Sequence, residues 1–190
     1  MLSGEACHKR VDLVFAFDTS GGLPRQQFTR TLEFAKRLVS QLNVGAVATR
    51  VGSVAFSNQI RVSLHLRDTT TLDDALKIFG KVPYRMGKRD LKQAMRSIET
   101  MFLEQNGNRA GIADVAIIIT DGFSGAEWST FKEESRSVTE RGIHLFQIVW
   151  QQKGRDVVNS GEGLFAVTNE QTLMGIVEKV KQAVCDVGSS

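Results

Sequence analysis

Apolar runs of strand length alternate with segments of helical spacing along the chain. Val11 to Phe17 is apolar except for Asp12 and ends abruptly in polar and glycine residues. That pattern is typical of a buried parallel strand that reaches the edge of its sheet. The stretch Asp114 to Thr120 has the same form and leads into Asp121 and Gly122. The pattern therefore predicts two buried strands with polar residues at their carboxyl ends.

The remaining pattern alternates between strands and helices. Apolar and polar residues alternate in 60–66, which indicates an edge strand with one solvent-exposed face. An Asn58-Gln59 turn joins this strand to the one before it, at 50–57. Further strands are predicted at 50–57, 143–150 and 163–167, and helices after Pro24, at 71–79, from 91, near 126–141 and at the end of the chain. This order predicts an α/β fold, a doubly wound, mostly parallel sheet with one antiparallel edge strand and helices on both faces.

Several helix ends carry local signals. Pro24 fits the first turn of a helix, and Thr71 with Asp74 and Asp90 with Gln93 have the spacing of capping boxes. Gly142 is suited to close the helix near 126–141. The spacing of the last apolar positions predicts a single final helix, which buries Leu173, Ile176, Val177, Val180 and Val184.

The composition indicates one domain. With 190 residues, of which 42% are hydrophobic, the chain can bury one sizeable core, and we predict a single domain over 1–190 with its core at about 11–186. A net charge of +3 gives no indication of nucleic-acid or membrane binding. No apolar run is long enough for a membrane helix, and the first ten residues lack the apolar core of a signal peptide. We expect a fragment of a larger protein.

The strand ends carry the candidate chemistry. Asp18, Thr19 and Ser20 lie where open α/β sheets bind ligands, and Asp121 ends the second buried strand. The two carboxylates need a partner, which can be a hard cation, a nearby basic side chain or the free amides of the following helix.

A basic run borders the same edge. Its residues are Arg85, Lys88, Arg89, Lys92 and Arg96. Such a run can receive an acidic partner or a sulfated glycan, or it can be an ordinary soluble surface. The three histidines are scattered without ligand spacing, so we assign them no role. Helical spacing with Phe131 favours core packing for Trp128.

Catalysis is not predicted. An Asp at the end of the first strand also begins phosphoaspartyl transferases, but FDTSGG lacks the second Asp that would act as acid and base. The chain contains no GxxxxGK[ST] loop and no GxSxG elbow. We therefore expect a binding protein rather than an enzyme.

The two cysteines lie near the two ends of the predicted domain. Cys7 precedes the first strand and Cys185 ends the last helical pattern. Because domain termini are often close together, a bridge between them is geometrically feasible, and it would imply an extracellular compartment. The alternative is two unrelated free thiols.

Taken together, DLVFAFDTSGG, the hairpin sequence GSVAFSNQI and IIITDG followed by a helix resemble a von Willebrand factor type A domain. The resemblance covers essentially the whole chain and implies a Rossmann-like fold. Cysteines at both ends resemble those of extracellular members from matrix proteins, which implies the Cys7–Cys185 disulfide and a secreted protein.

The resemblance also implies a metal-ion-dependent adhesion site. Asp18 and Ser20 match the first two ligands of its Asp-x-Ser-x-Ser loop, and Asp121 matches the distal Asp. Gly22 stands in place of the second Ser. The Thr of the family's second loop is replaced by Arg89 or Leu91. With two of five oxygen side chains missing, we expect Mg²⁺, Mn²⁺ or Ca²⁺ to bind weakly or not at all, leaving a vestigial site.

A basic side chain can take the place of the ion. Arg85, Lys88 or Arg89 can pair with Asp18 or Asp121, or all three can belong to a solvated loop. Asp90 can lend a carboxylate to a metal, but its predicted role as helix cap competes with that function.

The resemblance implies a protein-binding module for adhesion or matrix assembly, with collagen or another matrix protein as the candidate partner. The first alternative is a structural spacer or a homotypic assembly unit with a vestigial site. The second alternative is a binder of sulfated glycan or mineral through the basic loop.

Overall fold

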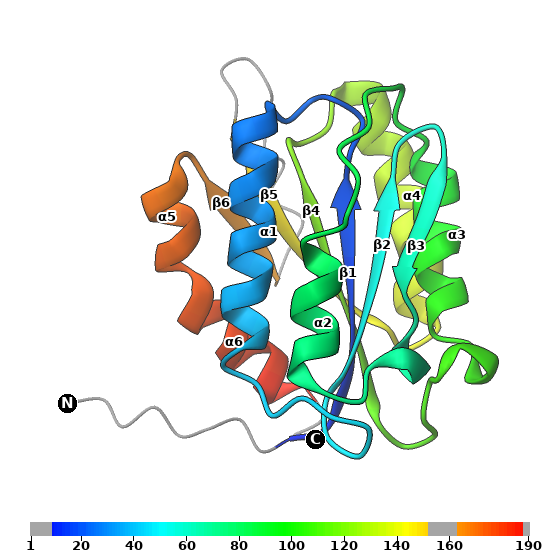
Figure 1. Ribbon diagram of the computed structural model, residues 1–190. Helices are drawn as coiled ribbons and strands as arrows, with labels where there is room; N and C mark the ends of the chain where they lie inside the picture. The colour runs from blue at the N-terminus through cyan, green and yellow to red at the C-terminus, as the bar shows by residue number, and fades with distance from the viewer. Residues whose placement is uncertain (1–8, 152–162, 188–190) are drawn as a thin grey trace.

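A computed structural model describes residues 9–151 and 163–187. A six-stranded sheet in the order β3-β2-β1-β4-β5-β6 forms the centre of the molecule (Figure 1). All neighbouring strands are parallel except β2 and β3, which are antiparallel. The strands are β1 Val11–Asp18, β2 Arg50–Phe56, β3 Ile60–Leu64, β4 Ala113–Thr120, β5 His144–Trp150 and β6 Leu164–Val167. The predicted doubly wound sheet with one antiparallel edge strand is confirmed.

Helices cover both faces of the sheet (Figure 1). α1, α2, α5 and α6 lie on one face, and α3 and α4 lie on the other. Their bounds are α1 Arg25–Val39, α2 Leu72–Phe79, α3 Leu91–Met101, α4 Gly125–Glu140, α5 Glu170–Gly175 and α6 Val177–Asp186, with short 3₁₀ turns η1 Leu66–Asp68 and η2 Glu104–Asn106. Each face has its own apolar core, because alternate side chains of the central strands point to opposite sides.

The two apolar runs of the sequence form the adjacent strands β1 and β4. Every residue of β1 is buried, and Phe17 of β1 lies beside Ile119 of β4. Because the strands are parallel and in register, the polar residues that follow them meet at one edge of the sheet. That edge lies at the top of Figure 1.

Most helix-end signals are confirmed. The Thr71 and Asp74 side chains form a reciprocal capping box, and the Asp90 side chain caps α3 by accepting from the Gln93 N–H. Gly142 follows α4 with a φ of 84°, a conformation that favours glycine. Pro24 differs from the prediction, because it stands at the N-cap position and α1 begins at Arg25.

Two packing predictions were wrong. The final helix is interrupted at Ile176, which ends α5 and precedes α6. In the edge strand, Val62 is 38% exposed, although it lies opposite the buried Val54 of β2. Leu66 lies beyond the strand, in η1.

The two cysteines lie near the two ends of the chain. Cys7 lies outside the described residues, so its bridge to Cys185 stays a prediction. Cys185 itself lies in α6 and packs, partly buried, against the core between the sheet and that helix layer. In the described part of the chain, none of the helices has the length and hydrophobicity needed to cross a membrane.

Candidate functional site

The candidate site begins at the carboxyl end of β1. Asp18 is almost fully buried, its Oδ1 accepts from the Ser20 N–H at 2.9 Å, and its Oδ2 accepts from the Thr120 hydroxyl at 2.8 Å. Thr19 is also buried, and both its N–H and its hydroxyl donate to Phe56 O. These bonds fix the loop after β1 against the ends of β2 and β4.

Asp121 fills the space beside Gly22. A Cβ atom placed on Gly22 would lie only 2.2 Å from Asp121 Oδ2, which is far inside a van der Waals contact. Gly22 has no positive φ, so its lack of a side chain matters here for space and not for backbone conformation. The Asp121 carboxylate thus occupies the volume that a side chain at position 22 would need.

Arg89 connects the two carboxylates. Its Nε lies 2.7 Å from Asp18 Oδ2, and its Nη2 donates to Asp121 Oδ1. Its Nη1 donates to Gly122 O at 2.8 Å and to Glu127 Oε1 at 3.2 Å. The Nε contact with Asp18 is an ion pair without the alignment of a hydrogen bond. One guanidinium therefore contacts three carboxylates and a carbonyl.

The surroundings of the Arg89 guanidinium keep it charged and shield it from solvent. Its side chain is only 4% exposed, and its carbon lies 5.4 Å from the centre of the Phe123 ring. Burial opposes the charge, but Asp18, Asp121 and Glu127 outweigh burial and raise the pKa of Arg89. The planar fork of an arginine suits such multidentate pairing better than a lysine does.

Comparison with known proteins identifies the family of this chain. Residues 12–178 match the von Willebrand factor type A domain family. The chain belongs to this family.

The relatives of this von Willebrand factor type A domain are matrix and adhesion proteins. It is 29% identical over 161 residues to mouse vitrin, covering 83% of this chain and 24% of vitrin. It is 28% identical to the mouse collagen alpha-4(VI) chain, covering 92% of this chain and 8% of the relative. It is 25% identical to mouse matrilin-2, covering 93% and 19%. The chain thus spans less than a quarter of each relative.

Solved structures share the fold. Proximal thread matrix protein 1 from the mussel byssus superposes with a TM-score of 0.84 at 19% identity, covering 96% of this chain and 50% of that one. The same mussel protein has also been solved with a zinc-occupied MIDAS motif, with a TM-score of 0.79 at 21% identity and coverage of 94% and 46%. These likenesses confirm the type A fold, and the zinc belongs to the mussel protein.

A divalent ion does not fit the type A domain site as its residues are arranged here. Asp18, Ser20 and Asp121 supply side-chain oxygens, Gly22 supplies no side-chain oxygen, and the Arg89 guanidinium lies between the two carboxylates. A metal ion in that position would face a buried cation that already pairs with its ligands. Among the described residues, no group of three or more His, Cys, Asp or Glu side chains is disposed to hold an ion.

The other predicted site residues lie around this centre. Asp90 caps α3, so its Oδ1 is occupied by the Gln93 N–H at 2.9 Å. Arg85 donates to Gln59 Oε1 at 3.0 Å, and Lys88 is exposed. Of the three candidate cations, only Arg89 enters the acidic site. Trp128 stacks on Phe131 and is partly buried, as the helical spacing predicted.

Sequence analysis missed three residues of the site, namely Thr120, Phe123 and Glu127. The pattern Ser124 to Glu127 has the spacing of a capping box, and Glu127 Oε2 does accept from the Ser124 N–H at 2.9 Å. That signal identifies the start of α4. It does not show that the other oxygen of Glu127 reaches Arg89.

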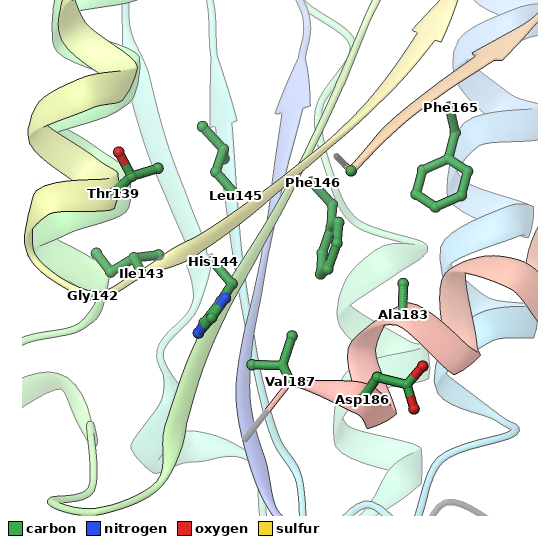
Figure 2. Close-up of a pocket in the computed structure, with 11 residues that line it drawn as sticks. Thr139, Gly142, Ile143, His144, Leu145, Phe146, Phe165, Ala183, Asp186 and Val187 are labelled. Carbon is green, nitrogen blue, oxygen red and sulfur yellow. The ribbon is translucent and has the colours of Figure 1, made fainter. Parts of the chain in front are cut away.

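A separate pocket lies at the opposite edge of the sheet (Figure 2). It has a volume of about 620 Å³ and lies between the start of β5, β6 and the end of α6. His144 and Phe146 point to the same side of β5, toward α6. None of the predicted site residues lines this pocket.

Proposed function

We propose that this type A domain is an extracellular module that binds a matrix protein without a metal ion. The observation that supports the proposal is the Arg89 guanidinium between Asp18 and Asp121. It supplies the positive charge that two buried carboxylates require. The relation to vitrin, collagen VI and matrilin-2 supports the matrix setting. Collagen or another matrix protein is the partner class we propose.

The same geometry argues against capture of a partner's carboxylate at Arg89. The guanidinium has five N–H groups, and its contacts with Asp18, Asp121, Gly122 and Glu127 engage all three of its nitrogens. With a side chain that is 4% exposed, it offers an approaching group almost no surface. Binding therefore uses the surface around this edge and not the buried cation.

The first test compares binding with and without divalent ions. We expect the domain to bind immobilised collagen or another purified matrix protein equally in EDTA, Mg²⁺ and Mn²⁺. Loss of binding in EDTA would overturn metal independence. Failure to bind any matrix protein tested, in metal or in EDTA, would overturn the binding function and favour a structural spacer.

Titration calorimetry with Mn²⁺ tests the site itself. We expect no binding to the wild type, and a gain of binding in Gly22→Ser/Arg89→Thr, which places hydroxyls at both positions and removes the competing cation. The matched control is Gly22→Ser/Lys88→Thr, which keeps Arg89 and should not bind. Mn²⁺ binding to the wild type that disappears in Asp18→Ala would contradict the proposal, whatever the variants do.

A further inference from the structure

The loop that carries Arg89 also forms an exposed surface beside the site. This surface, here called the basic rim, comprises Arg61, Arg85, Met86 and Lys88. The loop runs along the upper edge of the molecule from α2 to α3, next to the β2–β3 hairpin (Figure 1). All four residues are exposed.

Backbone contacts fix the shape of the basic rim. The Gly87 N–H donates to Ser20 O at 3.1 Å, and the Asp90 N–H donates to Ser57 O at 2.9 Å. A Cβ on Gly87 would lie 2.8 Å from Asn58 Oδ1, so the loop packs closely on the hairpin turn. A partner would therefore meet a surface that is already ordered, which lowers the entropic cost of binding.

The three cations of the basic rim have no carboxylate partner in the described part of the chain. Exposed cations elsewhere do pair, for example Lys92 with Glu134 and Arg141 with Glu99. Asp90 and Glu127, which line the same groove as Lys88, are engaged elsewhere, since Asp90 caps α3 and Glu127 pairs with Arg89. The rim thus presents three uncompensated positive charges, which attract an anionic partner.

Met86 adds an apolar contact in the middle of these charges. It is 77% exposed and lies over Gly21, where an added Cβ would approach its Cα and Cβ to 3.6 Å. A flexible thioether adapts to many partner surfaces. A sulfated glycan, which is anionic and polar throughout, would leave this side chain unused, whereas an acidic peptide with apolar residues would use it.

Hollows on both sides of the loop indicate the shape of the partner. One, of about 60 Å³, is lined by Arg61 and Arg85 together with Gln59 and Pro83. The other is an open groove of about 470 Å³, lined by Lys88 and Lys92 together with Asn58 and Thr130. Arg85 lines one hollow and Lys88 the other, and Met86 lies between these two residues in the chain. An extended segment that follows the loop can therefore contact all three.

We propose that the basic rim binds an extended acidic segment of a protein, with an apolar side chain of that segment on Met86. This inference rests on the proposed function, because it names the surface and the chemistry of the metal-independent partner. The partner's carboxylates pair with Arg61, Arg85 and Lys88, and the buried Arg89 stays with Asp18 and Asp121.

Fluorescence polarisation in EDTA tests the inference with a labelled peptide in which pairs of Glu alternate with single Leu residues. We expect Arg85→Gln/Lys88→Gln to weaken binding roughly ten-fold, as loss of two exposed ion pairs predicts. Met86→Ser should weaken it roughly five-fold through lost apolar burial. The control Lys132→Gln/Arg136→Gln removes two exposed charges from α4 and should change affinity less than about two-fold.

A second probe separates a peptide from a glycan. Replacing each Leu of the peptide by Ser should weaken binding to the wild type and leave binding to Met86→Ser unchanged. If the Ser peptide binds as well as the Leu peptide, or if heparin binds the wild type and Met86→Ser equally and more tightly than the peptide, the inference is wrong and the rim is a polyanion site. Equal losses in the rim and control variants would also overturn it.

The two proposals can fail separately. If the domain binds its matrix protein in EDTA and Arg85→Gln/Lys88→Gln has no effect on that binding, this inference fails and the proposed function stands. If binding to the matrix protein requires a divalent ion, the proposed function fails. Circular dichroism of each variant checks that these surface changes leave the fold intact.

Discussion

The two ends of β1 and β4 carry the same residue type but differ in how it is paired. At the carboxyl ends, Asp18 and Asp121 share Arg89. At the amino ends, Asp12 and Asp114 lie opposite each other in register, and Arg109 reaches only Asp12 of these two. Its Nε and Nη2 donate to Asp12 Oδ1 at 2.9 and 2.6 Å.

Among the described residues, the second carboxylate at the amino ends is therefore left without a cation. Asp114 Oδ2 accepts from Asn108 Nδ2 at 3.2 Å, while Oδ1 accepts no hydrogen bond from the described residues. Burial raises the pKa of Asp114 to about 6, with the charge of Asp12 adding to the rise and the Asn108 bond opposing it. A cation that contacts both carboxylates pairs with both, whereas one that contacts a single carboxylate leaves the other with a raised pKa.

Removing the two arginines should have the largest effects, and unequal ones. Arg89→Met leaves two buried carboxylates without their cation, which should cost about 3–5 kcal/mol of unfolding free energy. Arg109→Met should cost about 2 kcal/mol, because the backbone N–H of residue 109 still donates to Asp12. Urea unfolding measures both. Lys88→Met, an exposed neighbour, should change stability by less than about 0.5 kcal/mol, and equal losses for the two arginine variants would contradict the comparison.

A smaller effect should reveal the coupling between Gly22 and Arg89. Gly22→Ser should destabilise the wild type by about 1–3 kcal/mol, because the new side chain meets an Asp121 carboxylate that Arg89 holds in place. The Arg89→Thr substitution removes the guanidinium contact that holds Asp121, so the cost of the same substitution should fall in that background. A double-mutant cycle by urea unfolding in EDTA measures the difference. Additive effects would mean that Arg89 does not fix Asp121.

Much of the fold follows from the sequence because strand and helix periodicities are local. The apolar runs locate β1 and β4, and the Thr71 and Asp74 pair locates the start of α2. The errors arise where distant contacts decide. Apolar spacing continues through Ile176, so the spacing cannot show that the final helix breaks there. The alternation of apolar and polar residues in β3 cannot show that Val62 is left exposed at the edge of the sheet.

The site is less accessible to sequence reasoning. The strand pattern places Asp18 and Asp121 at one edge, and the basic loop supplies three candidate cations. Selecting Arg89 requires the path of the loop, which the Gly87 and Asp90 N–H groups fix through bonds to distant backbone carbonyls. No spacing rule relates positions that are so far apart in the chain. The same holds for Glu127, whose helix-cap role is visible in the sequence and whose contact with Arg89 is not.

The weakest predicted effect tests the unpaired carboxylate at the amino ends. Because the pKa of Asp114 is about 6 in the folded state and 3.8 is its ordinary value, the contribution of Asp114 to stability should fall as pH rises from about 4 to 6.5 and level off above. Asp114→Asn removes that loss, so its advantage over the wild type should grow by on the order of 1 kcal/mol between pH 4 and 7.5, after allowance for solvent screening of a half-buried group. Urea unfolding at both pH values measures it, with the exposed Glu133→Gln as a control that should show no such growth. A constant difference between Asp114→Asn and the wild type would show that Asp114 is paired in solution, and that the two ends of β1 and β4 do not differ as described.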